Sequence, residues 1–441
     1  MHSSSNPSSL LKPHSRSFFP QLLRVEGGAF SNLLASGAAD GDASRLATQL
    51  TAGATVWRRL LDFHIDSFYD GGCGALQPTV RVVLRIALFE ILILKCAHHA
   101  ASHQAVELVR AGGKPAAAGL VNAVVRKACR AAAAGALPPP PSPAVACSFP
   151  DWIAHRWTAR FGSDEAIALM RASNRVASFG IRPTATFSPL PPPSPNPNLP
   201  PLSPLDALAA ACEALGVATS PSVLLPNKLL SVSAALFPLR PLLSSGAIAL
   251  QDESASLVVL LLRPRPGMRV ADVCAAPGGK ALFAASLGAD VTAVDESPPR
   301  MRMLTVAAAA QGVSARVSGV VGTAEHFCSD AQSAAAFDAV LLDAPCTGLG
   351  VLSKRSDLRW RRVLADVGAA AVRPFPSLPP LTVLLLLFLN PDYSRLGECS
   401  HRRSSDGFWT ARRRSSAPAG FSSTAPAPPS RRRTRASSSL F

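Results

Sequence analysis

The sequence has no apolar run long enough to cross a lipid bilayer. Its longest purely apolar stretch lies near Leu384–Leu389, whereas a transmembrane helix needs roughly 20 such residues. An internal repeat at a fixed period is also missing. These absences predict a soluble protein with no membrane partner, and we expect it to be a monomer.

Paired cysteines are missing too. The nine cysteines are scattered along the chain, and no two of them form a Cys-x-x-Cys pair or alternate with histidine at ligand spacing. We therefore expect a reducing compartment and no zinc or other metal site. Residues 1–25 contain Lys12, Arg16 and Arg24 among many serines and no acidic residue, which resembles a chloroplast or mitochondrial transit peptide. A disordered terminus of a cytoplasmic protein explains this composition equally well.

Acidic residues are scarce. The chain has 28 Asp and Glu against 44 Lys and Arg, which gives a formal charge of +16. This excess favours a polyanionic partner, nucleic acid above all, because basic side chains release counterions from phosphates. Part of it lies in arginine runs at 402–403, 412–414 and 431–433, and such runs are usually a solvated tail. Both the folded part and the tail are therefore candidates for nucleic-acid contact.

The first half of the chain is predicted to hold a helical domain. A length of 441 residues corresponds to two or three domains of roughly 100 to 200 residues each. Within Thr51–Ala134 the apolar residues recur at three- and four-residue steps, which is typical of helices. We expect a helical domain over 46–136, preceded by a disordered or transit-peptide-like segment, 1–45. Consecutive prolines in Leu137–Pro143 forbid a helix, so 137–150 is predicted to be a linker.

The second half is predicted to be α/β. Region 151–250 begins with a helical pattern over Asp151–Asn174 and contains a Pro-Ser-Asn segment, 188–204, which is expected to be a disordered insertion. From Val258 short apolar runs alternate with helical segments, as in a doubly wound parallel sheet, so 251–365 is the expected core. After Arg362 this alternation fails, and 366–441 is expected to be an irregular basic tail that leaves the sheet incomplete at its C-terminal strands.

A glycine turn is the strongest local feature of that core. The run Val270–Lys280 reads as a strand, a tight turn at Gly278–Gly279 and a helix that begins near Lys280. Glycine lets a ligand approach the backbone, and the helix start offers N–H groups without partners. A nucleoside or carboxylate fits such a turn, whereas the Gly-x-Gly-x-x-Gly pattern of dinucleotide sites is absent. An ordinary strand-to-helix turn is the alternative, and two glycines alone would favour it.

Two further strands end in chemically useful residues. Strand Asp290–Val294 is followed by Asp295, and an acid at that point can accept hydrogen bonds from ribose hydroxyls. A solvated loop acid is the competing interpretation. The run Phe337–Gly348 delivers Asp343 and Cys346 to the carboxyl end of another strand. Because open α/β sheets bind ligands at that edge, we expect these residues to face one crevice with Asp295 and Cys274. A lone cysteine is more often buried, but the neighbouring proline and glycine argue against burial of Cys346.

These strings resemble a known family. Cys-Ala-Ala-Pro-Gly-Gly-Lys at 274–280 and Leu-Asp-Ala-Pro-Cys-Thr-Gly-Leu-Gly at 342–350 resemble the NOL1/NOP2/Sun family of RNA (cytosine-5) methyltransferases. The resemblance covers roughly Trp152–Arg362, the insertion excepted, and includes Gln251–Ala255 and Asp357–Trp360. It implies a Rossmann-like domain that binds S-adenosylmethionine, with region 151–250 as an RNA-binding region.

The helical domain carries a second resemblance. The segments Pro78–Leu94, His103–Leu108 and Gly119–Arg126 resemble an RNA-binding NusB-type domain, and this fusion is the arrangement of the bacterial Sun group, the small-subunit ribosomal RNA methyltransferases B. The resemblance implies α + α/β architecture and methylation of cytosine C5 in ribosomal RNA. A catalytically inactive RNA-binding protein that keeps the helical domain and the cofactor pocket is the alternative.

The resemblance also assigns roles to single residues. A cysteine thiolate adds to C6 of a flipped-out cytosine, C5 takes the methyl group, and a base then removes the C5 proton. Asp343 would hydrogen-bond the base edge, and Cys346 would help to release the product. The attacking thiol belongs to a later Thr-Cys-Ser motif, which this sequence lacks, so Cys399 in Glu-Cys-Ser is the candidate nucleophile. The family's acid near Val320–Gly322 is also missing, with Glu325 as a substitute. The expected contacts to S-adenosylmethionine are Cys274, Ala275, Ala276, Pro277, Gly278, Gly279, Lys280, Asp295 and Asp343.

Overall fold

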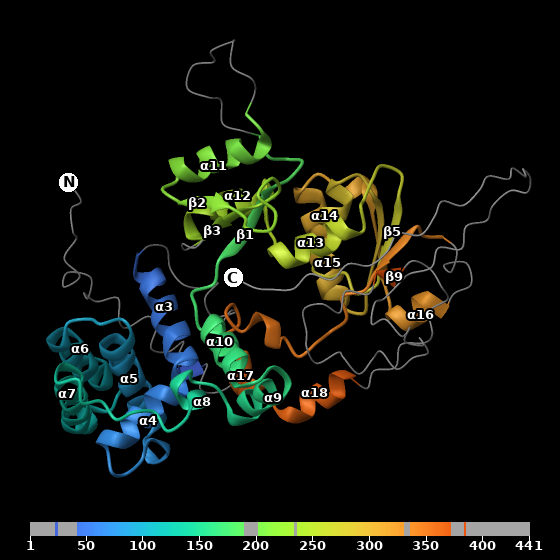
Figure 1. Ribbon diagram of the computed structural model, residues 1–441. Coiled ribbons are helices and arrows are strands. Elements are labelled where there is room, and N and C mark those ends of the chain that lie inside the picture. The colour runs from blue at the N-terminus through green and yellow to red at the C-terminus, as the bar shows by residue number, and fades with distance from the viewer. Residues whose placement is uncertain are drawn as a thin grey trace, which may run out of the picture. The chain divides into compact units, whose positions relative to one another are not determined.

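The computed structural model in Figure 1 describes most of the chain up to Ala371. The described residues are 23–24, 42–188, 202–232, 236–329, 336–371 and 383–384. Most of the expected insertion and most of the expected basic tail, with Cys399, lie outside these ranges. Within the described part of the chain, no helix is both long enough and apolar enough to cross a membrane.

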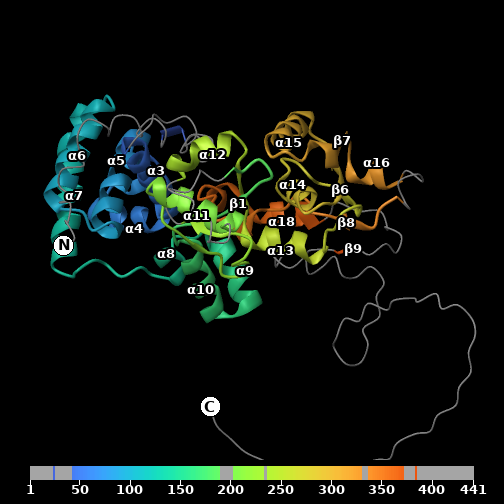
Figure 2. The same ribbon diagram turned by 90° about the horizontal axis from the view of Figure 1, so that it is seen from above.

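The first domain is a bundle of helices, drawn blue to cyan in Figures 1 and 2. Their apolar faces meet in one core that contains Leu61, Val83, Ile86 and Val125, all without exposed surface. The expected all-helical domain is therefore confirmed. Its elements are α3 Asp42–Val56, α4 Arg58–Phe68, η2 Cys73–Ala75, α5 Pro78–Leu88, the π-helical turn η3 Phe89–Ile93, α6 His98–Ala111, η4 Pro115–Ala117 and α7 Ala118–Ala133.

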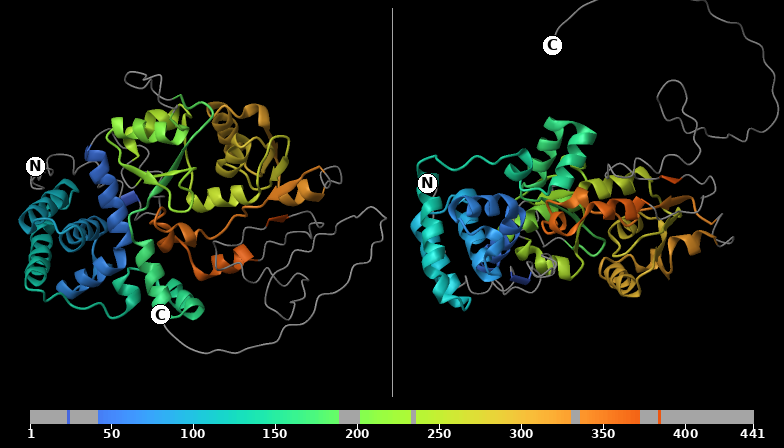
Figure 3. Two further views of the ribbon diagram at one scale, coloured as in Figure 1. Left: turned by 45° about the horizontal axis from the view of Figure 1, so that its top comes forward. Right: turned by 90° about the horizontal axis from the view of Figure 1, so that it is seen from below.

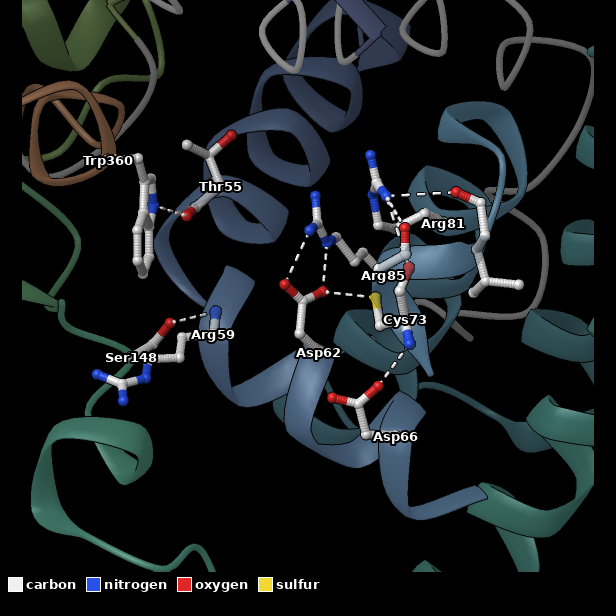
Figure 4. Close-up of polar contacts among 11 residues, drawn as sticks. Thr55, Arg59, Asp62, Asp66, Cys73, Arg81, Arg85, Ser148 and Trp360 are labelled. Atoms are coloured by element: carbon white, nitrogen blue, oxygen red, sulfur yellow. Dashed lines mark hydrogen bonds and ion pairs between the residues drawn. The ribbon is translucent and has the colours of Figure 1, made fainter. Parts of the chain in front are cut away.

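A buried ion pair joins α4 to α5 inside this bundle. Arg85, whose side chain is 4% exposed, donates to both carboxylate oxygens of Asp62 at 2.6 and 2.8 Å, and the Cys73 thiol also contacts Asp62 (Figure 4). Burial and this carboxylate raise the pKa of Cys73 to about 12. The thiol therefore stays protonated and acts as a structural donor.

A pair of helices follows the linker. The expected single stretch 151–174 is two helices, α9 Asp151–Phe161 and α10 Ser163–Ser173, because Gly162 between them has a φ of +84°, which ends the first helix. A short helix, α8 Pro143–Ala146, precedes them. Ile153, Trp157 and Met170 of this pair pack against Leu349 and Leu358 from much later in the chain.

A small antiparallel sheet comes next, which the sequence pattern did not predict. Its strands β1 Phe179–Pro183, β2 Thr219–Pro221, β3 Leu230–Val232 and β4 Ile248–Leu250 lie in the order β2-β3-β1-β4. Helix α11 Pro204–Ala214, the turn η5 Phe237–Leu239 and helix α12 Arg240–Ser244 accompany it, and Ile181, Leu208 and Val232 share its core. Helix α11 begins at the last residue of the predicted insertion, with Ser203 as its cap.

The remaining sheet is parallel and carries the candidate site. Strands β5 Arg269–Asp272, β6 Asp290–Asp295, β7 Val317–Val321, β8 Ala339–Leu341 and β9 Val383–Leu384 lie in the order β7-β6-β5-β8-β9. Val270 faces Val291 on one side and Ala339 on the other. The strand order therefore reverses between β5 and β8, which is where open α/β sheets bind ligands. The expected α/β domain is confirmed.

Helices connect these strands and cover the sheet (Figures 1 and 3). Proline at the start of α15 and the Ser297 hydroxyl, which accepts a hydrogen bond from the Arg300 backbone N–H, set the beginning of that helix. Helix α13 Glu253–Leu261 precedes the first strand, and α14 Gly279–Ser286, α15 Pro298–Ala310, η6 Ser314–Arg316 and α16 Ala324–Ser329 lie between β5 and β8. The elements after β8 are η7 Leu349–Val351, α17 Leu358–Arg361 and α18 Leu364–Ala371, and Leu358 of α17 packs with α9 and α10 instead of the sheet.

The prediction of an irregular tail from residue 366 is wrong for two elements. Helix α18 continues to Ala371, and β9 pairs with β8 in parallel, Val340 facing Val383 and Leu341 facing Leu384. The prolines before β9 hid this strand in the sequence, because nothing local shows that it joins a neighbour distant in the chain. The sheet therefore has at least one strand on the far side of β8.

Candidate active site

One cavity lies at the carboxyl ends of β5, β6, β7 and β8. Its volume is about 600 Å³, which is within the usual range for small-molecule sites. Four sequence-predicted residues from three strand ends meet there, Cys274, Asp295, Asp343 and Cys346. The cavity is also lined by Ala275, Ala276, Pro277, Gly279 and Lys280, whereas Gly278 is not among its lining residues.

The glycine turn shapes the floor of this cavity. Gly278 has a φ of +113°, which side chains rarely adopt, and a Cβ there would lie 3.0 Å from Leu304 Cγ. At Gly279 a Cβ would meet open space, so a side chain at this lining position would occupy the cavity. Helix α14 begins at the same residue, and the first N–H groups of a helix have no partner within it. The turn therefore leaves room and donors for a ligand.

Asp295 ends β6 beside the turn. Its side chain is 4% exposed, and it accepts hydrogen bonds from the backbone N–H of Ala276 at 3.1 Å and of Ser297 at 3.0 Å. The Arg300 guanidinium lies 3.5 Å from the same carboxylate. Because an ionised carboxylate can accept about four hydrogen bonds, Asp295 keeps acceptor capacity for a ligand. Its backbone partners hold it rigidly in the cavity wall.

Asp272 is a carboxyl group that sequence reasoning did not assign. It is the last residue of β5, is 1% exposed and lines the cavity. Burial raises the pKa of this carboxyl to about 7, against the opposing charge of Lys280. It therefore exchanges a proton near neutrality. The signal in the sequence was an acid at the end of an apolar run, directly before the glycine turn.

An ion pair crosses the cavity wall from the turn to β8. Lys280 Nζ lies 2.5 Å from Asp343 Oδ2, with the lysine side chain 21% exposed and the aspartate 57% exposed. The lysine comes from the start of α14 and the aspartate from the loop after β8. The pair thus holds the Asp343 carboxylate at the cavity while leaving much of it accessible.

The two cavity cysteines differ in their surroundings. Cys274 is half-buried, and burial together with the charge of Asp272 raises the pKa of its thiol to about 12. A thiolate at Cys274 is therefore disfavoured. Cys346 is exposed at the cavity. The third sequence candidate, Cys399, lies outside the described residues.

An acidic residue on the helix that follows β7 also lines the cavity. Glu325, in the first turn of α16, lines the cavity together with Gly322 and Thr323, whereas Val320 and Val321 are not lining residues. The substitute acid named from the sequence thus reaches the cavity. Carboxyl groups outnumber cationic groups in the cavity lining. The basic lining residues are Lys280 and Arg300, and the acidic ones are Asp252, Asp272, Asp295, Glu296, Glu325 and Asp343.

The antiparallel sheet supplies the opposite wall. Phe179 and Gly180 of β1 and Leu250 of β4 line the cavity, followed by Gln251 and Asp252. Lys354 pairs with Asp252 and lies 5.6 Å from the Phe179 ring. Only Gln251 and Asp252 were singled out from the sequence. Phe179 gave no signal, because its place at the cavity depends on how β1 pairs with β4.

The chemistry of the lining residues fits a cationic, hydroxylated ligand. An excess of carboxylates favours a positive centre, Asp295 offers acceptors to hydroxyl groups, and the start of α14 offers donors to a carboxylate. S-adenosylmethionine has a sulfonium, an ammonium, a carboxylate and ribose hydroxyls, so the residues present fit it. Across the described ranges, no three His, Cys, Asp or Glu side chains are grouped to hold a metal ion.

Comparisons with known proteins agree with this chemistry. A family model described as 16S rRNA methyltransferase RsmB/F matches residues 259–373, and a NusB family model matches residues 22–130. A putative methyltransferase of Mycobacterium tuberculosis is 32% identical over 385 residues, which cover 82% of this chain and 78% of the relative.

Two further comparisons extend this result. The ribosomal RNA small subunit methyltransferase B of Xylella fastidiosa is 32% identical over 297 residues, covering 67% of this chain and 64% of that protein. The crystal structure of PH0851 superposes with a TM-score of 0.61 at 21% identity, covering 84% of this chain and 81% of that one. At such identity the superposition supports the fold alone.

Proposed function

This chain belongs to the RsmB/F family of 16S rRNA methyltransferases, and on that premise we propose that it methylates carbon 5 of a cytosine in small-subunit ribosomal RNA. It is an RNA methyltransferase with a NusB-type domain, and its methyl donor is S-adenosylmethionine. When bound, this donor supplies an electrophilic methyl group on a sulfonium centre. We propose the target base, its C5 atom and the cysteine adduct in addition to this family assignment.

Three groups of residues are proposed to hold the donor. The turn 274–280 provides a backbone surface without bulky side chains at Gly279 and the N–H groups at the start of α14. Asp295, fixed by two backbone N–H groups, accepts hydrogen bonds from the ribose hydroxyls. Glu325 serves the adenine end. The buried Asp272 carboxyl adds negative charge beside the turn when it is ionised.

The proposed chemistry needs a thiolate because cytosine C5 is a poor nucleophile. Addition of the thiolate to C6 moves electron density onto C5, which then takes the methyl group, and loss of the C5 proton allows the cysteine to leave. Cys399 is the proposed attacking residue, and Cys346, which is exposed at the cavity, is proposed to assist release. Cys274 is unsuited to attack, because the raised pKa keeps its thiol protonated.

Asp343 is proposed to orient the base. Its carboxylate is more than half exposed at the cavity and is held by Lys280 at 2.5 Å. A carboxylate can accept a hydrogen bond from the exocyclic amine of cytosine, which distinguishes this base from uracil. The target base must leave its stack to reach Asp343, which is cheaper where the RNA is single-stranded.

A single observation carries the proposal: the glycine turn, Asp295 and the Asp343–Cys346 loop line one cavity at the switch point of the sheet. The test incubates the full chain with tritiated S-adenosylmethionine and unmodified small-subunit ribosomal RNA, followed by nucleoside chromatography. We expect label in 5-methylcytidine. Label in any other nucleoside would contradict the proposed chemistry.

Three cysteine variants assign the thiols. Cys399→Ala is expected to abolish transfer, and Cys346→Ala is expected to accumulate a covalent protein–RNA complex that survives denaturing electrophoresis. Cys328→Ala is the matched control, since Cys328 lies on α16 outside the cavity lining, and it should behave as the parent. Normal turnover in Cys399→Ala would remove that residue from the mechanism.

A second candidate is a non-catalytic RNA-binding protein. It is favoured by one observation: the sequence has no Thr-Cys-Ser motif for the attacking thiol and offers only Glu398-Cys399-Ser400 in its place, whereas the proposed reaction uses two thiols. Binding of the donor and of RNA without any incorporation of tritium would support this candidate over the enzyme.

A further inference from the structure

A short segment after the cavity, Asp357–Arg362, contacts three parts of the protein. We call these residues the α17 segment, because they contain helix α17. Arg359 is its anchor: this side chain has no exposed surface, donates to Asn174 Oδ1 at 2.7 Å and lies 4.2 Å from the Phe149 ring. Its Nη1 group also donates to the Ser148 carbonyl and its Nη2 group to the Ser173 carbonyl, whereas Nε has no partner in the part of the chain that the structure describes. Because a buried charge is costly without such bonds, these contacts hold the α17 segment against the residues that flank α9 and end α10.

The same segment holds the backbone next to Cys346. Arg362 Nε donates to the carbonyl oxygen of Thr347 at 2.9 Å, and Thr347 is 3% exposed. Gly348 has a φ of +75°, and a Cβ there would lie 3.0 Å from Leu358 Cδ1. The loop that carries Cys346 is therefore tied to the α17 segment by the Arg362–Thr347 hydrogen bond and by the close packing of Gly348 against Leu358.

A third contact reaches the helical domain. Trp360 Nε1 donates to the carbonyl oxygen of Thr55 at 2.6 Å, as Figure 4 shows, and the Arg58 guanidinium lies 5.5 Å from the Trp360 ring. Thr55 belongs to the last turn of α3, where carbonyl groups have no partner within the helix. The indole N–H therefore satisfies a carbonyl that the helix leaves open.

A second set of contacts joins the helical domain to the residues around Arg359. Arg59 at the start of α4 donates to the Phe149 carbonyl at 2.5 Å and to Asp151 at 2.8 Å, and its backbone N–H donates to the Ser148 hydroxyl (Figure 4). The Ser148 carbonyl and the Phe149 ring also contact Arg359. A continuous series of contacts thus runs from α3 and α4 through the α17 segment to Thr347.

We propose that Trp360 and Arg362 are positioning residues that fix the Cys346 loop relative to α3 and α4, so that RNA bound by the helical domain meets the cavity in one register. This inference rests on the proposed function, since it assumes that Cys346 acts on RNA. Each residue acts through a backbone carbonyl, Thr55 in one case and Thr347 in the other. Neither side chain is proposed to touch the reacting base.

The first test measures hydrogen exchange in the full chain at the loop amides of Val351, Lys354 and Arg355, which donate within the loop. Trp360→Phe keeps a ring but removes the N–H, and Arg362→Met removes the bond to Thr347. Loss of one hydrogen bond is expected to speed exchange at these amides about fivefold in each variant. Arg362→Lys, which keeps a donor, should restore part of the protection.

Matched controls separate local coupling from general loosening. Trp152→Phe changes a half-buried tryptophan of the same core, and Arg302→Met changes an exposed arginine on α15. In both controls the exchange rates of the loop amides should stay within about twofold of those in the parent, which is a smaller change than the loss of one hydrogen bond predicts. Unchanged loop exchange in Trp360→Phe would overturn the inference, whether or not the chain methylates RNA.

The second test separates positioning from binding. In an active parent, Trp360→Phe should lower kcat for ribosomal RNA about fivefold, with the Kd for RNA and for S-adenosylmethionine unchanged, because no binding group is removed. An unchanged kcat despite faster exchange would show that the Trp360–Thr55 contact serves packing alone, and this would overturn the positioning role. In an inactive parent, RNA should slow loop exchange less in Trp360→Phe than in the parent, and equal slowing would overturn the inference. Absence of methyl transfer in the parent counts against the proposed function alone.

Discussion

Replacement of Asp295 by asparagine tests the cofactor site most directly. Both carboxylate oxygens of Asp295 accept backbone N–H groups, from Ser297 at 3.0 Å and from Ala276 at 3.1 Å. In Asp295→Asn one oxygen becomes an NH₂ group, which faces one of these donors whichever way the amide turns. The variant therefore loses a charge toward the ligand and gains a buried clash between donors.

The magnitude follows from these contacts. A hydrogen bond to a charged group contributes about 1.5–3 kcal/mol, so loss of the carboxylate should weaken binding of S-adenosylmethionine roughly 10- to 100-fold. One unsatisfied buried N–H costs about 1–3 kcal/mol of folding free energy. Arg300 is 49% exposed and can turn to water, so we add no cost for its lost partner.

Asp290→Asn is the matched control, because it makes the same change at the first residue of the same strand. Asp290 is 53% exposed and pairs with Arg316 at 3.1 Å, and exposed pairs contribute about 0–1 kcal/mol. Titration calorimetry with S-adenosylmethionine, beside urea unfolding, separates binding from stability. An equal donor Kd in Asp295→Asn and Asp290→Asn would refute the assignment of Asp295 to the donor site.

Three further predictions concern burial. Arg359→Met should lower the free energy of unfolding by about 2 kcal/mol, since Asn174 loses a charged donor and the Phe149 ring loses a cation; a urea midpoint equal to that of the parent would contradict this. Iodoacetamide should modify Cys346 before Cys274, because the pKa of Cys274 is raised to about 12, and peptide mass spectrometry that found the reverse order would be inconsistent with the site. Burial raises the pKa of Asp272 from 3.8 to about 7, so the folded state binds this proton more tightly and the group costs stability as pH rises through that window. Asp272→Asn should therefore gain stability over the parent between pH 4 and pH 7, with no further gain above pH 8, and urea unfolding at several pH values checks the sign.

Much of the architecture could be predicted because its signals are local. The helical periodicity before the linker and the alternation after Val258 correctly indicated a helical domain and a parallel sheet. The glycine turn lies within eleven consecutive residues, and the family match confirmed the family, the enzyme class and the methyl donor that the turn and the Asp343–Cys346 string implied. The break between α9 and α10 is the exception, since the apolar pattern continues across Gly162, whose positive φ interrupts the helix.

Sequence alone determined that Cys274, Asp295, Asp343 and Cys346 lie at or just after the ends of three strands, because each follows an apolar run directly in the chain. Parallel pairing then brings those ends to one edge whatever the connections are. Only the tertiary structure decided the rest: the cavity wall formed by Phe179, the ion pair of Lys280 with Asp343, and the burial of Arg359 against Phe149 and Asn174. Each of these features depends on a contact between segments far apart in the chain. The free energy of burying a side chain depends on the partner that it meets there, and the local sequence does not show that partner.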